Sequence, residues 1–177
     1  MKYITDFIYK LLLVIYCCPI ILLATQNEIV STQYKSHKVE VGIESISKDG
    51  EDYIISIYAI NPYDPIAGVQ FKIIPEDLFT IKKVYGGRTE ENDFQIHHNK
   101  TGTILGFSMV ANTLDKSIIV SGPDKLKQNI VLNIKASANS IQNYDKNTVI
   151  GLECVFASKK GLVLESKYVP FKLSQIK

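Results

Sequence analysis

The sequence has no tryptophan and only three cysteines, and the cysteines limit what can hold the fold together. Cys17 and Cys18 lie in an apolar N-terminal stretch, so a chain without that stretch keeps only Cys154. A single cysteine cannot form an intramolecular disulfide, and the stability of the fold must therefore come from its core. We interpret Cys154 as a small buried hydrophobe in a strand. A reactive thiol is the alternative, but no histidine or basic residue stands beside Cys154 to lower its pKa.

The chain also lacks an excess of charge of one sign. Its formal net charge is +2, and its longest basic runs are pairs such as Lys82-Lys83 and Lys159-Lys160. Binding of nucleic acid requires a concentrated basic patch, so we do not expect this class of partner. Hydrophobic residues make up 46% of the 177 residues, which is enough for a full core, and the length suits one domain with a targeting segment.

Sequence motifs of catalysis are missing as well. There is no G-x-S-x-G nucleophile motif and no phosphate-binding loop, and Gly86-Gly87 indicates a turn that ends a strand, with no helix signal after it. A pair of catalytic carboxylates can be recognised only in space, but the small size of the domain disfavours a glycosidase. We therefore expect a protein that is not an enzyme.

Patterns for metal binding are weak. His97 and His98 are adjacent, so on a strand they point to opposite faces and cannot both bind one metal ion. Residues 90–93 could offer oxygens to Ca²⁺, but they lack the alternating acidic pattern of a calcium loop. We interpret the charged segment from Arg88 to Asp93 as an exposed loop, and we expect no metal and no other cofactor.

The N-terminus carries the longest apolar run, from Leu11 to Ala24, with Lys2 and Lys10 before it. This run has the length of a signal-peptide core and is shorter than the roughly 20 residues of a membrane-spanning helix. We predict a signal peptide over residues 1–24, a short tether over 25–36, and a domain over 37–174 that is extracellular or attached to the cell surface. An uncleaved leader that anchors the chain in the membrane and a core helix are the alternatives.

The rest of the chain is typical of short strands separated by turns. In the clearest strand, Val69, Phe71 and Ile73 alternate with polar or small residues, and this period of two gives the strand one apolar face. Turn signals recur about every ten residues, which predicts an all-β fold: a single β-sandwich of the jelly-roll type with about nine strands. The other expected strands start at Val39 or span 53–60, 80–85, 94–97, 103–111, 129–138, 148–156, 162–164 and 169–173.

Residues 103–111 are expected to form one of these strands, and their pattern suggests which side chains face the core. Leu105, Phe107 and Met109 share one phase of the alternation and are expected to point inward. Gly106 and Ser108 share the other phase and are expected to point outward.

Three stretches in order resemble the cohesin family. They are Pro65 to Thr80, with its I-A-G-V-Q-F strand and P-E-D-L turn, Thr103 to Ser108, and Ile130 to Ala138, and Gly86-Gly87-Arg88 stands between the first two. The resemblance runs from about residue 37 to residue 173. It implies a non-catalytic sandwich that binds a dockerin-like protein module or a polysaccharide.

The resemblance also implies that one sheet carries the partner-binding face. On the positions of this sequence, that face would hold Gly68, Gln70 and Lys72 on the strand that follows Pro65. His97 would lie near the end of the strand that starts at Phe94, and Ser108 on the strand that follows that one.

Two classes of function remain open from the sequence. The first is a secreted cohesin-like module that mediates protein–protein or carbohydrate attachment, and the alternative is a structural surface or adhesin subunit that assembles through its sheet edges. For carbohydrate binding, exposed rings would have to stack on sugars, and Tyr58, Tyr63 and Tyr85 are the candidates. A sequence for N-glycosylation begins at Asn99 in an expected turn, and it would matter only in a host that glycosylates asparagine.

Overall fold

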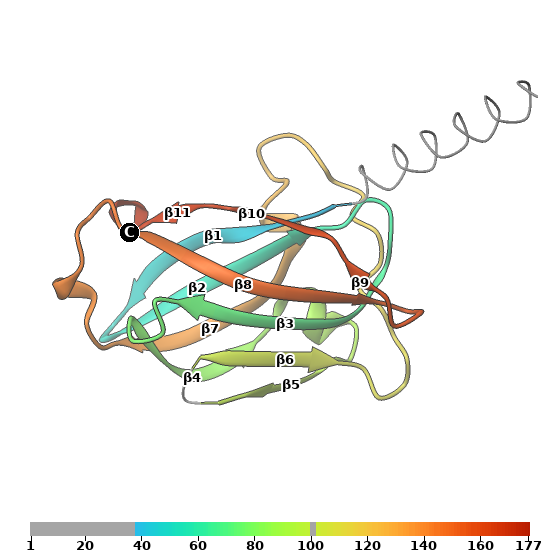
Figure 1. Ribbon diagram of the computed structural model, residues 1–177, viewed down its shortest axis with the longest axis horizontal. Helices are drawn as coiled ribbons and strands as arrows, with labels where there is room; N and C mark the ends of the chain where they lie inside the picture. Colours follow the sequence, from blue (N-terminus) through green and yellow to red (C-terminus); the bar gives the residue numbers. More distant parts are fainter. Residues whose placement is uncertain (1–37, 100–101) are drawn as a thin grey trace, which may run out of the picture. The chain divides into compact units, whose positions relative to one another are not determined.

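The computed structural model describes residues 38–99 and 102–177, and in them two β-sheets pack face to face (Figure 1). The predicted leader and tether, residues 1–24 and 25–36, lie outside the described residues. The first sheet, named here the β1 sheet, has the order β10 (Ser166–Val169), β1 (Val39–Asp49), β2 (Asp52–Ile60), β7 (Ile130–Ala138) and β4 (Phe79–Tyr85). The second, the β3 sheet, has the order β11 (Phe171–Lys172), β8 (Val149–Ser158), β3 (Ile66–Ile74), β6 (Thr103–Phe107) and β5 (Gln95–His98), with β9 (Val163–Leu164) paired to β8.

Neighbouring strands are antiparallel throughout, except that β1 and β10 run parallel. The helical elements are short: α2 (Gly87–Glu91) and the 3-10 turns η1 (Lys127–Asn129), η2 (Ile141–Asn143) and η3 (Leu173–Gln175). None of the helices in the described ranges is long and apolar enough to cross a membrane.

The core lies between the two sheets and is built from the alternating positions that the sequence suggested. Val69, Phe71 and Ile73 of β3 are buried, and the Phe71 ring meets Phe156 of β8 edge to face with centroids 5.6 Å apart. Edge-to-face geometry places the positive edge of one ring against the negative face of the other. The predicted all-β sandwich is confirmed, with eleven strands in the described residues where about nine were expected, two of which are only two residues long.

The prediction for residues 103–111 was wrong in length and in phase. The strand β6 ends at Phe107, and its buried positions are Ile104 and Gly106, whereas Leu105 is 43% exposed and Met109 lies in a loop. Gly106 faces inward because there is no room for a side chain: a Cβ there would lie 2.6 Å from Ile96 Cδ1. The inward glycine turns Leu105 and Phe107 to the outer face of the sheet.

The prediction that no helix follows Gly86-Gly87 was also wrong. Both glycines have positive φ, 69° and 62°, and α2 begins at Gly87. The carboxylate of Glu90 accepts a hydrogen bond of 2.5 Å from the backbone N–H of Gly86 and closes the turn. Thr89 is buried and donates its hydroxyl to Val131 O, so the segment predicted to be an exposed loop is partly packed against β7.

Candidate partner-binding face

The outer side of the β3 sheet forms a continuous surface across β8, β3, β6 and β5, named here the β3 face. Its middle row follows from the strand register: Gln70 of β3 pairs with Val155 of β8 on one side and with Leu105 of β6 on the other. His97 of β5 continues the row beyond Leu105. Val155 and Leu105 are 44% and 43% exposed, so two aliphatic side chains flank the central glutamine on an open surface.

A second row of the β3 face is flat and partly aromatic. Gly68 lies between Ala157 of β8 and Phe107 of β6, and Gln95 of β5 lies beyond Phe107. The His97 ring stacks on Phe107, with centroids 6.0 Å apart and planes 24° from parallel. A Cβ at position 68 would meet its nearest neighbour, Ala157 Cβ, only at 3.6 Å, so the low profile at this position reflects the absence of a side chain and not crowding.

The third row of the β3 face is charged. Lys72 lies between Glu153 of β8 and Thr103 of β6, and its ammonium group is 2.6 Å from the carboxylate of Glu76. The hydrogen bond to Glu76 raises the pKa of Lys72, with a smaller contribution from the charge of Glu153. The β3 face therefore combines an aliphatic and aromatic centre with charged groups at one side, which is the usual composition of a protein interface.

Four of the five predicted face residues lie on the β3 face, and one does not. Gly68, Gln70, Lys72 and His97 are outward-facing residues of β3 and β5. Ser108 follows the end of β6, and its hydroxyl accepts hydrogen bonds from the N–H groups of Val110 and Asn112. The expected place of Ser108 on a strand was wrong because Ser108 holds the turn that leaves the sheet.

Sequence reasoning missed the aliphatic and aromatic part of the β3 face. Leu105 and Phe107 were expected in the core, and Val155 was not singled out. The inward-facing, half-buried Cys154 beside Val155 is the signal that could have found it, because neighbouring strand residues point to opposite faces.

The structure places the tyrosines proposed for sugar stacking in different environments. Tyr58 is only 2% exposed. The pKa of its phenol is raised, and burial is the largest cause of this shift. Its hydroxyl donates to Glu40 Oε1 at 3.5 Å. Because the ring is buried, the prediction of Tyr58 as a sugar-stacking residue was wrong. Tyr63 is 45% exposed and belongs to the loop before β3. None of the three lies in the strands of the β3 face.

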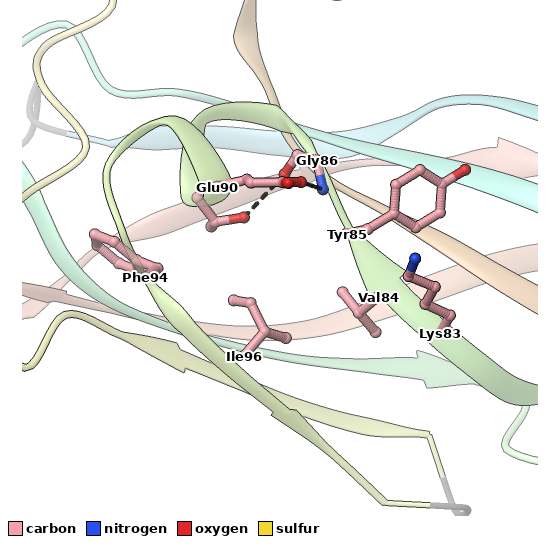
Figure 2. Close-up of a pocket in the computed structure, with 8 residues that line it drawn as sticks. Lys83, Val84, Tyr85, Gly86, Glu90, Phe94 and Ile96 are labelled. Atoms are coloured by element: carbon pink, nitrogen blue, oxygen red, sulfur yellow. Dashed lines mark hydrogen bonds between the residues drawn. The ribbon is translucent and has the colours of Figure 1, made fainter.

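Tyr85 lines a groove of about 320 Å³ between β4, α2 and β5 (Figure 2). Its ring is already covered by Lys83, whose Nζ lies 5.4 Å from the ring centroid. The backbone N–H of Gly86 donates to the carboxylate of Glu90 at one wall of the groove. Its other walls include the apolar side chains of Val84, Phe94 and Ile96.

The remaining candidate residues have structural surroundings. Cys154 is half-buried, its Sγ lies 3.4 Å from Ser166 Oγ, and burial raises the pKa of the thiol, which keeps it in the less reactive protonated form. Asn99 is exposed just after β5, and its side-chain oxygen accepts a hydrogen bond from Thr103 N–H. Within residues 38–99 and 102–177, no group of three or more metal-ligand side chains comes together.

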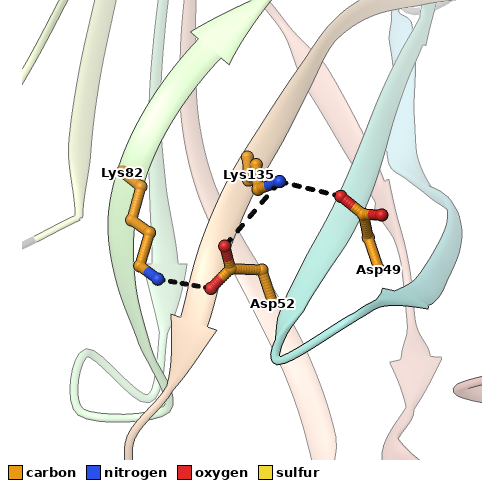
Figure 3. Close-up of polar contacts among 4 residues, drawn as sticks. All are labelled: Asp49, Asp52, Lys82 and Lys135. Carbon is orange, nitrogen blue, oxygen red and sulfur yellow. Dashed lines mark hydrogen bonds and ion pairs between the residues drawn. The ribbon is translucent and has the colours of Figure 1, made fainter.

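The outer side of the β1 sheet has a different character from the β3 face. Lys135 of β7 reaches Asp49 Oδ2 at 2.8 Å and Asp52 Oδ2 at 3.8 Å, and Lys82 of β4 is 2.5 Å from Asp52 Oδ1 (Figure 3). The hydrogen bond to Asp49 raises the pKa of Lys135. The charged groups of this network are paired with one another, so few of them are left to form ion pairs with a partner.

Comparison with known proteins rests on structure alone, because no family model and no curated protein matches the sequence. Solved structures do match. The cohesin CaCohA2, solved in complex with the dockerin CaDoc0917, superposes with a TM-score of 0.51 at 15% identity over 75% of this chain and 96% of its own. A type I cohesin–dockerin complex from Clostridium thermocellum gives a TM-score of 0.50 at 13% identity over 76% of this chain and 91% of its own.

The chain has a cohesin-like fold. The similarity covers nearly the whole length of each solved chain. At 13–15% identity the similarity concerns the fold, and it carries no residue of the binding sites across.

Proposed function

We propose that this protein is a secreted, non-catalytic binding module whose β3 face binds a dockerin-like protein partner. The observation that carries the proposal is the middle row of the β3 face. There Leu105 and Val155 are exposed on an open sheet on either side of Gln70. Exposed aliphatic side chains in the middle of a sheet surface are the kind of group that an interface buries at its centre.

The surroundings of this row support a protein partner over a polysaccharide. Leu105 and Val155 can be desolvated by an apolar partner surface, and Lys72, Glu153 and Gln95 can contribute hydrogen bonds at the rim. Sugars are usually held by exposed aromatic rings, and the ring of Phe107 on this face is already stacked by His97. Both solved structures named above are cohesins in complex with dockerins, which agrees with this choice of partner.

Affinity capture tests the proposal. The chain from Thr25 to Lys177 is immobilised and exposed to a panel of purified dockerin modules, with calcium and with a chelator. We expect at least one dockerin to be retained in a one-to-one ratio and released by the chelator, because dockerins fold around calcium loops. Replacing Gln70 and Lys72 by alanine should weaken retention.

Two other results would contradict the proposal. Retention on polysaccharide with no dockerin bound would favour a carbohydrate-attachment module. Self-association that grows with protein concentration, with no dockerin bound, would favour the structural subunit that assembles through sheet edges.

A further inference from the structure

The loops at one end of the sandwich expose apolar side chains that the β3 face does not include. The loop after β6 presents Met109, Val110 and Ile118, which are 70%, 69% and 92% exposed. The β8–β9 hairpin presents Leu162 and Val163, which are 64% and 74% exposed. We call these five residues the apolar tips. Single exposed hydrophobic residues are common on protein surfaces. Here, two neighbouring loops both expose several of them.

The strand pairing places both loops at the same end of the molecule. Ile66, the first residue of β3, pairs with Leu114 of the long loop and with Ser158 at the start of the hairpin turn. Val39, the first described strand residue, donates its backbone N–H to Glu165 O just after β9. In Figure 1 the hairpin at β9 and the loop that follows β6 lie at one end, opposite the C-terminus.

The opposite end of the sandwich has a different composition. Its described loops include the β1–β2 turn at Gly50, the β3–β4 turn from Pro75 to Asp77 and the β7–β8 connection over 139–147. The large hydrophobic residues of that connection, Ile141 and Tyr144, pack against the core. Among the described residues of these three loops, no large hydrophobic side chain is exposed. Among these described loops, the exposed large hydrophobic side chains therefore lie at one end, and at the other end Val149 at the start of β8 is exposed.

The long loop holds its apolar tips in a fixed position and does not fold them inward. Arg88 of α2 donates hydrogen bonds to Asp115 O and to Asn61 Oδ1, and the backbone N–H of Ser117 donates to Asn61 O. The buried Asn129 donates its amide to Ile119 O and Lys125 O, each at 2.7 Å. These bonds hold the loop against the rest of the domain, and the side chains of Met109, Val110 and Ile118 are exposed on it.

We propose that this end of the sandwich inserts its apolar tips into the surface of a phospholipid bilayer. Short tips from separate loops can each enter the boundary between headgroups and acyl chains, which requires no single contiguous apolar patch. Lys159 and Lys160 precede Leu162 and Val163 in the hairpin, separated from them by Gly161, and their ammonium groups can reach lipid phosphates while the aliphatic residues insert.

Co-sedimentation with vesicles tests the inference on the chain from Thr25 to Lys177. This part keeps every core residue between Val39 and Leu173, which form one compact unit, and it contains no part of the apolar run. We expect it to bind vesicles of phosphatidylcholine with phosphatidylserine. The variant with serine at positions 109, 110, 162 and 163 (Met109→Ser, Val110→Ser, Leu162→Ser, Val163→Ser) should bind at least about tenfold more weakly. The reason is that each removed apolar side chain no longer contributes its free energy of transfer from water into the bilayer.

A matched control comes from the β3 face. The variant Leu105→Ser, Val155→Ser also removes two exposed aliphatic residues, and it should bind vesicles as the parent chain does. Both variants change exposed side chains, so their melting temperatures should stay close to that of the parent. Binding should persist at about 0.5 M salt, where charge attraction is screened within a few Å.

Three results would overturn the inference: no binding of the parent to vesicles, equal binding of the tip variant and the parent, or complete loss of binding at high salt. The inference is independent of the proposed dockerin partner, since the tip variant should bind a dockerin as the parent does. Failure of one proposal therefore leaves the other unaffected.

Discussion

Gly106 is the residue on which the β3 face depends most directly. It points into the core, and a Cβ at this position would lie 2.6 Å from Ile96 Cδ1 and 2.9 Å from Val69 Cγ2. We predict that Gly106→Ala lowers the free energy of unfolding by about 1–3 kcal/mol through overpacking. Urea unfolding of the purified chain measures this change.

Gly68 provides the matched control on the neighbouring strand. It pairs with Phe107 on the outer face, and a Cβ there would make an ordinary contact of 3.6 Å with Ala157 Cβ. Gly68→Ala should change the free energy of unfolding by no more than about 0.5–1 kcal/mol, and the lost chain entropy of glycine favours a gain. Equal losses in the two variants would mean that β6 does not have the phase described here.

The phase of β6 could not be predicted from its residues, and the reason is specific. In β3 the apolar residues Val69, Phe71 and Ile73 occupy one phase only, so the pattern identifies the buried face. In β6 both phases are apolar, with Ile104 on one and Leu105 and Phe107 on the other. The sequence favours the phase with more apolar residues, whereas the structure selects the one in which Gly106 makes room for Ile96 and Val69.

At the scale of elements, Arg88 connects α2 to the long loop between β6 and β7. Its half-buried guanidinium donates to Ala59 O, Asn61 Oδ1 and Asp115 O, and burial lowers its pKa. We predict that Arg88→Met lowers the free energy of unfolding by about 2–3 kcal/mol, because hydrogen bonds to a charged group are lost from a partly buried site. Proteolysis within residues 109–126 should become faster.

The control for this prediction is Lys116→Met, which removes an exposed cation from the same loop. It should leave both the stability and the proteolysis rate nearly unchanged. If Lys116→Met and Arg88→Met have the same effect, Arg88 is not what holds the loop in place.

Asp77 connects two other elements, the β3–β4 turn and the β7–β8 connection. The hydroxyl of Tyr144 donates to its carboxylate at 2.6 Å and that of Ser140 at 2.8 Å, and these bonds lower the pKa of Asp77 below 3.8. A lowered pKa means that the ionised carboxylate stabilises the folded state above pH 3.8, and that this stabilisation is lost as the pH falls through the folded-state pKa.

We therefore predict that the melting temperature of the parent falls more steeply on acidification below about pH 4 than that of Asp77→Asn. Thermal unfolding monitored by circular dichroism between about pH 7 and pH 2 measures the two slopes. Asp124→Asn, which changes an exposed loop carboxylate, should follow the parent curve. Identical slopes for the parent and Asp77→Asn would show that these hydrogen bonds do not favour the charged form.

The helix α2 shows which elements sequence reasoning could not find. Its five residues are too few for a helical period, and a glycine pair followed by charged residues is equally typical of a turn and an exposed loop. The partners that fix it are remote: Ala59 O and Asn61 for Arg88, and Val131 O for Thr89. Such partners are known only after the sheets are assembled.

At the scale of the whole molecule, the sequence was sufficient for the architecture and for part of the β3 face. Alternation and turn spacing gave the all-β sandwich, and the resemblance placed Gly68, Gln70, Lys72 and His97 on the side where the structure has them. The apolar tips could not be predicted, because exposed residues such as Leu162 and Val163 are indistinguishable in sequence from strand residues of a core.

The central claim is that the β3 face binds a protein partner, and calorimetric titration of single-residue variants tests it most directly. The dockerin retained most strongly in the capture experiment is titrated into the parent chain, into Leu105→Arg, and into Val169→Arg, which alters an exposed valine of the other sheet. We predict that Leu105→Arg raises the Kd at least about tenfold by placing a charge in the buried centre of the interface, with Val169→Arg unchanged. Equal affinity of Leu105→Arg and the parent would contradict the account.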